Sequence, residues 1–173
     1  TSLDKAEPIT HVGIGQAKVE KGASNRRILG PDGKVQYVRP SSSRNPILFE
    51  LPEGLIDPYV KIVSLWNGER PVVCLSYYAC HPQSYYGKGD VTCEFIGIAR
   101  NQRQAELKVP HVHFNGAGGN VAAGKYNDGA PETRKVLTSR FHDGLRRAWE
   151  ATKKQPLAVD TIEWRVAPVD IPV

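Results

Sequence analysis

The sequence predicts an α/β protein with a mixed β-sheet and flanking helices. Two apolar, β-branched and aromatic runs, 59–66 and 72–79, flank Asn67-Gly68, which is a strong β-hairpin signal. A long amphipathic pattern at 132–153 predicts a helix, and strand and helix patterns alternate through the second half of the chain. With 173 residues, we expect one domain, residues 1–173, that is large enough for a real core.

The first third of the chain contains one strand pattern and a long irregular stretch. Residues 9–20 alternate partially between apolar and polar side chains, which predicts a strand. Residues 21–58 are rich in Gly, Pro, Ser, Asn and Arg without a sustained period. A loop of about 38 residues is far longer than the usual connection, and such loops are commonly functional or disordered. We therefore expect a long, functional-type loop before the hairpin.

The second half predicts two helices and two strands. Thr92 can cap a helix that continues to about residue 106, with an imperfect apolar stripe. Residues 109–114 predict a short strand that enters a glycine-rich loop at 115–120. Pro131 opens the strongest helix, about 132–153; Pro156 ends it, and 157–166 predict a final strand. The apolar positions of the two helices are Phe95, Ile96, Ala99 and Leu107, and Val136, Leu137, Phe141, Leu145, Ala148 and Trp149.

Composition excludes several classes of protein. The net charge is +5, but the basic pairs, such as Arg146-Arg147 and Lys153-Lys154, are scattered and lack interleaved aromatic residues, so we expect a solvated helix face and no nucleic-acid partner. No apolar run approaches the ~20 residues of a transmembrane segment. Three cysteines cannot all pair, and no C-x-x-C motif is present. The chain has no Met, even at position 1, so we expect a piece of a longer protein.

Histidines provide two candidate sites. His81 follows an apolar strand in Ala79-Cys80-His81-Pro82, where it could serve as a zinc ligand or general base. The alternative is a histidine that is hydrogen-bonded in a turn. His111 and His113 lie two residues apart on a strand, so both rings could approach one metal. No local carboxylate completes that site, and a satisfied strand pair is the alternative.

Two loop segments could bind an anion. The Gly-Ala-Gly-Gly core of 115–120 exposes backbone N–H groups and tolerates positive φ, as an oxyanion cradle requires. It matches neither phosphate-binding glycine motif, and a plain turn is the alternative. Arg26 and Arg27, in Ser24-Asn25-Arg26-Arg27, could hold a carboxylate or oxyanion, unless they are simply solvated.

Taken in order, these segments resemble the catalytic domain of neutral (non-lysosomal) ceramidases, and more closely bacterial ceramidase-like proteins. The resemblance covers residues 13–154 and only the middle of the family's domain. The family's Asn-Arg-Ser segment matches Asn25-Arg26, its His-Gly-Thr-Ser motif matches His81 to Ser84, and its Ser-Gly-Asp segment matches Lys88-Gly89-Asp90.

The resemblance implies a zinc-dependent hydrolase that cleaves the amide of a sphingolipid substrate. It implies that Arg26 is an active-site residue and that His81 is a zinc ligand, with the other zinc ligands outside this chain. Ser84 and Asp90, like His111 and His113, are possible additional site residues. It also implies an extracellular or periplasmic location and a small-molecule or lipid amide as the partner.

One loop departs from the family pattern. The family reads Gly-Asp-Val-Ser, with the Ser implicated in catalysis, whereas this chain reads Gly119-Asn120-Val121-Ala122. Gly119 and Asn120 are therefore candidate catalytic-loop residues in a site without that hydroxyl. We expect a ceramidase-like, zinc-dependent hydrolase of an N-acyl bond, present as a fragment. The alternatives are a catalytically inactive binding module on the same fold, and a different hydrolase that uses His111 or His113.

Overall fold

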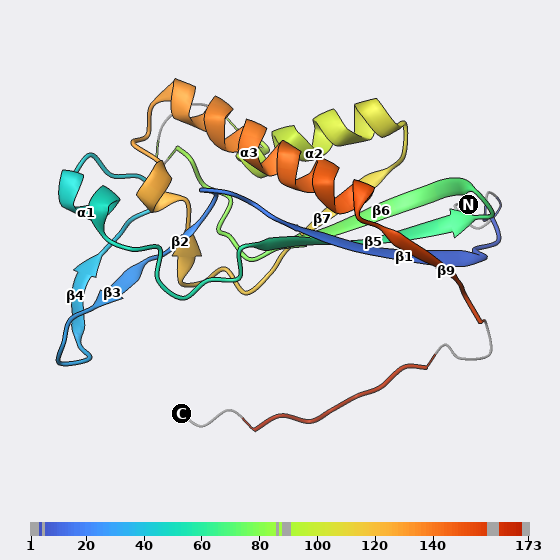
Figure 1. The fold of residues 1–173 in the computed structure, drawn as a ribbon, viewed down its shortest axis with the longest axis horizontal. Helices are drawn as coiled ribbons and strands as arrows, with labels where there is room; N and C mark the ends of the chain where they lie inside the picture. Colours follow the sequence, from blue (N-terminus) through green and yellow to red (C-terminus); the bar gives the residue numbers. More distant parts are fainter. Residues whose placement is uncertain (1–3, 5, 86, 88–90, 159–162, 171–173) are drawn as a thin grey trace.

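The computed structural model describes residues 4, 6–85, 87, 91–158 and 163–170. Its largest sheet has five strands in the order β7–β6–β5–β1–β9. They are β1 (His11–Lys18), β5 (Tyr59–Asn67), β6 (Arg70–Tyr78), β7 (His111–Asn115) and β9 (Lys153–Pro156). β6 and β7 are parallel and the other pairs are antiparallel. Helices α2 (Glu94–Leu107) and α3 (Pro131–Glu150) lie together over one face (Figure 1). The predicted α/β class with a mixed sheet is confirmed.

The hairpin forms where Asn67-Gly68 predicts it. β5 and β6 pair antiparallel up to Asn67 opposite Arg70. Gly68 has a φ of +59°, which a residue without a Cβ adopts at little cost. The two turn residues are Gly68 and Glu69, and a β-bulge between Leu65 and Trp66 shifts the register of the central strands by one residue.

The stretch at 21–58 was expected to be one long loop, and this expectation is wrong in part. It contains β2 (Ser24–Asn25), β3 (Arg27–Leu29), β4 (Val35–Val38) and α1 (Pro46–Glu50). The Asn45 side chain caps α1 by accepting the N–H of Ile47 at 3.1 Å. β3 pairs with β4, whereas β2 pairs with the distant β8 (Val121–Ala122). These strands are too short to show a period, and the partner of β2 is remote in sequence.

The expected end of the chain also needs correction. α3 ends at Glu150, and Lys153–Pro156 form β9, so the expected strand at 157–166 is wrong where the structure describes it. Residues 157, 158 and 163–170 have no regular secondary structure, and 159–162 lie outside the described residues. Lys-Lys-Gln-Pro has no strand pattern of its own. It becomes a strand because it pairs with residues 11–14 of β1.

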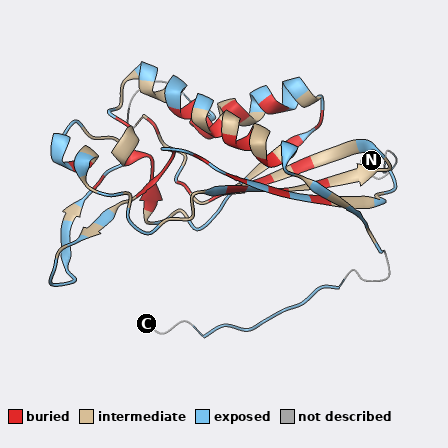
Figure 2. Cartoon of the chain, viewed as in Figure 1, coloured by how far each residue is buried: buried red, intermediate tan, exposed pale blue. Residues whose placement is uncertain are grey.

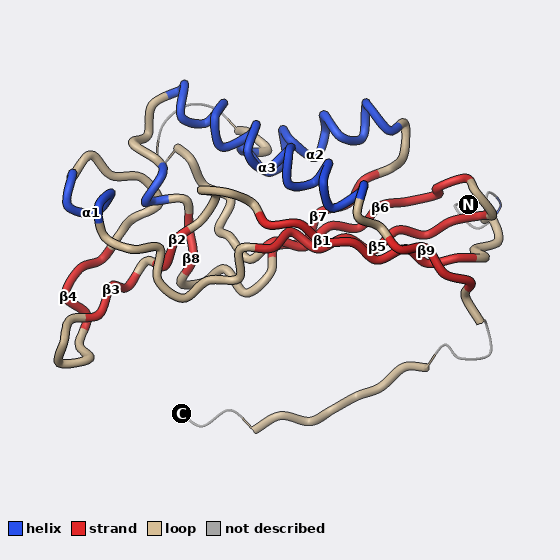
Figure 3. Tube along the Cα trace, viewed as in Figure 1, coloured by secondary structure: helices blue, strands red, loops and turns tan. Residues whose placement is uncertain are grey.

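The core lies between the helices and the sheet (Figures 2 and 3). α3 packs on β1 and β5, and α2 packs on β7. The predicted stripes are buried at Phe95, Ile96, Ala99, Leu137, Phe141, Leu145 and Ala148, together with the β-sheet residues Val60, Ile62, Cys74 and Tyr78. Val136 departs from the prediction because it is exposed. Trp149 is partly buried and stacks on Trp66 of β5, with ring centroids 5.3 Å apart.

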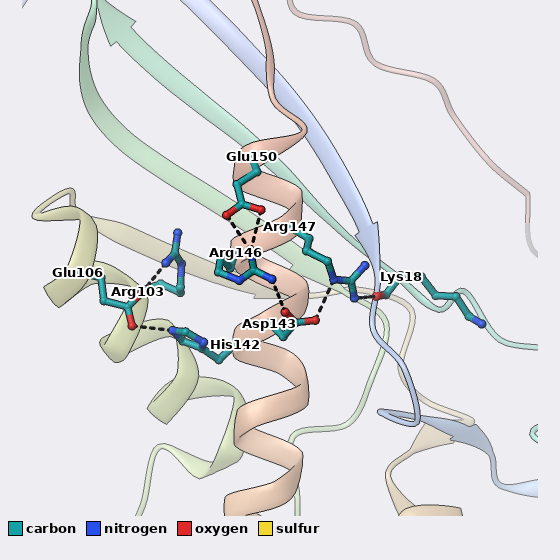
Figure 4. Close-up of polar contacts among 8 residues, drawn as sticks. All are labelled: Lys18, Arg103, Glu106, His142, Asp143, Arg146, Arg147 and Glu150. Atoms are coloured by element: carbon teal, nitrogen blue, oxygen red, sulfur yellow. Dashed lines mark hydrogen bonds and ion pairs between the residues drawn. The ribbon is translucent and has the colours of Figure 1, made fainter.

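Charged side chains connect α3 to its neighbours (Figure 4). Asp143 pairs with Arg146 at 2.7 Å and with Arg147 at 2.8 Å, and Arg147 also donates to the Lys18 carbonyl. Arg146-Arg147 thus belong to a solvated, ion-paired face, as predicted. Lys153-Lys154, expected on the same helix, lie on β9 instead. Exposed pairs of this kind stabilise a protein by about 0–1 kcal/mol each.

Among the described residues, no helix is long and apolar enough to cross a membrane.

Candidate functional site

Three segments that lie far apart in the sequence meet beside the end of β6. Ser24 and Asn25 of β2 pair with Ala122 and Val121 of β8. The N–H of Arg26 donates to the Asn120 carbonyl at 2.8 Å, and the N–H of His81 donates to the Val121 carbonyl at 2.9 Å. The backbone therefore brings Arg26, His81 and the 119–122 segment together.

His81 lies three residues beyond the end of β6, with an exposed side chain. Its backbone forms a parallel bridge with Ala122, and its carbonyl accepts the N–H of Gln83 at 2.9 Å. The backbone at His81 is thus fixed on both sides, while the imidazole faces solvent. This arrangement leaves the ring available to a ligand or a metal.

Some polar side chains of the site have hydrogen-bond partners, and one buried donor does not. Asn120 accepts from Arg27 Nη1 at 3.1 Å, and its Nδ2 donates to Asn25 Oδ1 at 2.9 Å. The buried Nε of Arg26, in contrast, has no hydrogen-bond partner among the described residues. Arg26 therefore has a donor to offer, whereas the Asn120 amide joins the glycine loop to β2. The Arg27 and Asn25 contacts were not predicted, although both residues lie in the motif that contains Arg26.

The glycine-rich loop packs directly on the strand end that precedes His81. A Cβ at Gly116 would lie 3.2 Å from the Ala79 backbone, and one at Gly118 would lie 3.1 Å from the backbone of Cys80 and His81. None of the loop's glycines has a positive φ, so close approach is the reason for glycine at 116 and 118. The N–H groups of Gly116 and Gly118 donate to backbone carbonyls at 2.9 and 2.7 Å. Fewer amides are therefore free for an oxyanion than the sequence suggests.

Arg39, a buried arginine that the sequence did not single out, holds the backbone next to Arg26. The Arg39 side chain is fully buried and donates to four backbone carbonyls, at 2.9–3.2 Å. One of them belongs to Asn25, next to Arg26. No local pattern distinguishes Arg39 from a solvated loop arginine, because its partners are main-chain groups brought to it by the fold.

Ser84 holds the chain beyond His81. Its buried hydroxyl donates to the Glu94 carboxylate at the start of α2, and its carbonyl accepts from Asn127 Nδ2 at 2.8 Å. The hydroxyl is thus engaged in joining this loop to α2. Asp90 lies outside the described residues.

His111 and His113 lie elsewhere, between the sheet and the helices. They pair in register with Cys74 and Ser76 of β6. His111 Nε2 is 3.8 Å from Cys74 Sγ, and His113 Nδ1 is 2.8 Å from Ser76 Oγ. Both rings share a face, as expected, but the structure does not bring them into the group around His81. Within the described ranges, no group of three or more His, Cys, Asp or Glu side chains could hold a metal ion.

Burial lowers the pKa of both His111 and His113 to about 4. The unfolded chain binds these protons near pH 6.5, before the folded chain does, so stability is full above pH 6.5 and is lost as pH falls toward 4. We expect the free energy of unfolding to fall by up to about 1.4 kcal/mol per pH unit for each histidine. Urea unfolding at pH 7.5 and pH 5.5 measures this loss. His113→Gln should reduce the difference in the free energy of unfolding between the two pH values. If the free energy of unfolding changes with pH equally in the variant and in the unmodified chain, the prediction is contradicted.

Two solved structures resemble this fold over most of the chain. The crystal structure of neutral ceramidase from Pseudomonas aeruginosa matches with a TM-score of 0.55 at 13% identity and covers 82% of this chain. A ceramidase complexed with C2 matches with the same TM-score and coverage at 12% identity. This chain has a ceramidase-like fold. It spans 22% of the length of either ceramidase chain.

The ceramidase-like fold agrees with the resemblance that the motifs indicate. The sequence itself matches no family model and no curated protein. At this level of identity the comparison establishes the fold alone. A function for this chain has to be argued from the residues around His81.

Proposed function

We propose that this chain is the central part of a ceramidase-like hydrolase that cleaves an amide (N-acyl) bond of a lipid or small-molecule substrate. The convergence of Arg26, His81 and the 119–122 segment carries the proposal, because these are the positions that the ceramidase motifs single out. The ceramidase-like fold supports it. We further propose an extracellular or periplasmic location, which follows only from the family resemblance.

Arg26 is the residue of this chain that we assign to the substrate. Its unused Nε donor can hold a carbonyl oxygen that gains negative charge, and a charge-assisted hydrogen bond is stronger than a neutral one. Asn120 and Gly119, predicted as catalytic-loop residues, lie next to it. We assign Asn120 to positioning the loop, because both ends of its amide are engaged by Arg27 and Asn25.

We propose His81 as one ligand of a zinc ion. A catalytic zinc takes about three protein ligands, and it polarises a carbonyl when bound. The described residues do not form such a site by themselves. The remaining ligands would therefore come from a longer protein that contains this chain.

Zinc content tests the role of His81. In the full-length protein, His81→Ala is expected to reduce stoichiometric zinc to background, as measured by mass spectrometry of the metal, and to abolish hydrolysis of a fluorogenic N-acyl substrate. His142→Ala serves as the matched control, because His142 pairs with Glu106 at 2.8 Å on the helical layer. The isolated chain should show no tight zinc binding. Unchanged zinc in His81→Ala, or tight zinc in the isolated chain, would contradict the assignment.

A catalytically inactive binding module is the second candidate function. Ala122, where ceramidases carry the serine, is buried within β8 and pairs with Ser24. No hydroxyl is therefore present at that position. Binding of an N-acyl lipid by the full-length protein without turnover, even with zinc present, would favour this function over hydrolysis.

A further inference from the structure

The sheet face opposite α2 and α3 carries a continuous row of apolar side chains. Ile14, Val63, Leu75 and Val112 are aligned in register across β1, β5, β6 and β7. They alternate with the buried residues that face the helices. Ile14 is 55% exposed and Val112 is 44% exposed. Such a patch on a sheet marks a surface that packs against something.

The row of residues that contains Tyr77 and Phe114 adds aromatic side chains to this surface. Tyr77 stacks on Phe114 with ring centroids 5.1 Å apart. Tyr77, Ile14 and Val63 line a groove of about 620 Å³, and Lys61 and Lys153 line the same groove. The face thus combines an apolar floor with Lys153 and with a Lys61 that already pairs with Asp57.

Within the segment Glu163–Asp170, residues 163–166 alternate between charged and apolar side chains. Trp164 and Val166 are 90% and 80% exposed, and they alternate with the charged residues Glu163 and Arg165. An extended segment with this alternation has one apolar and one polar side. In Figure 1 it runs on the side of the sheet away from α2 and α3.

We propose that Glu163–Asp170 is a strap that docks across this sheet face, with Trp164 and Val166 against the apolar row. The tether is long enough: the N–H of Leu157 donates to the Thr10 carbonyl, and six residues from there to Glu163 span up to about 20 Å. The distance across the sheet from β9 to β7 is four strand spacings, about 19 Å. A strap on the same chain is also present at a high effective concentration, which favours it over a second copy.

Disulfide trapping tests the docked state. In the full chain with Cys93→Ser, Leu75→Cys is combined with Trp164→Cys, with Val166→Cys or, as the matched control, with Arg165→Cys. Successive residues of an extended segment point to opposite sides, so we expect at least one apolar position to cross-link ~5-fold faster than position 165. The product should be a monomer on a non-reducing gel. Rates equal to the control, or cross-links only between two chains, overturn the proposal.

Dye binding gives a second measurement on chains without new cysteines. Trp164→Ser with Val166→Ser should release the strap and raise the fluorescence of a hydrophobic-surface dye at least ~2-fold, since exposed apolar patches bind such dyes. Glu163→Ser with Arg165→Ser is the control and should change it less. A decrease in the first variant means that the two apolar residues were themselves the exposed surface, and this outcome overturns the proposal.

Discussion

Replacing Arg39 with alanine is expected to lower the free energy of unfolding by about 3–5 kcal/mol. The guanidinium is fully buried and donates to the carbonyls of Asn25, Leu48, Leu51 and Pro52. Alanine removes all these donors at once, and each buried carbonyl that is left without a partner costs about 1–3 kcal/mol unless water reaches it. Urea unfolding at neutral pH measures the loss.

Arg39→Lys and Arg44→Ala complete the experiment. Lysine keeps the charge but cannot reproduce the planar fork, so an intermediate loss is expected. Arg44 is exposed, and Arg44→Ala should cost less than about 0.5 kcal/mol. A loss below about 1 kcal/mol for Arg39→Ala would mean that water replaces the guanidinium, and Arg39 would then not hold the loop beside Arg26.

Gly15→Val is expected to destabilise the protein by at least about 3 kcal/mol. A Cβ at Gly15 of β1 would lie 2.2 Å from the Ala148 carbonyl oxygen and 2.9 Å from Thr152 Oγ1. The nearer atom is helix backbone, so α3 would have to move away from the sheet. Thermal unfolding followed by circular dichroism measures the effect.

Gly119→Ala is the matched control for Gly15→Val. A Cβ at Gly119 would meet nothing within 4 Å, and this residue does not have a positive φ. Its stability should therefore change by less than about 0.5 kcal/mol. Equal losses in the two variants would contradict the prediction, because the contact with α3 would then not set the cost at Gly15.

Sequence reasoning succeeded where the determining signal is local. Asn67-Gly68 predicted the hairpin because a turn signal between two apolar runs is contained in a few neighbouring residues. Leu137, Phe141 and Leu145 predicted the buried face of α3 because helical periodicity repeats over many residues. Pairings between distant segments have no such signal. For this reason β2 was missed, and β9 was assigned to the helix that precedes it.

The same distinction applies to the candidate site. The motifs around Arg26, His81 and Asn120 were singled out in the sequence, and the fold brings them together. The contacts that hold them, such as Arg39 with the Asn25 carbonyl or Asn120 with Arg27, could not be predicted. Main-chain carbonyls look alike in every sequence. Their partners become visible only when the fold places a donor beside them.

The pairing of β1 with β9 has a consequence for how the chain folds. β1 lies between β5 and β9, and its partner β9 comes from the far end of the described chain. While the protein is being synthesised, β1 can pair with β5 early, but its other edge stays open until β9 emerges. An open strand edge is a template for pairing with other chains. Folding of this sheet is therefore governed by a high contact order, and we expect its last step to be slow and prone to aggregation.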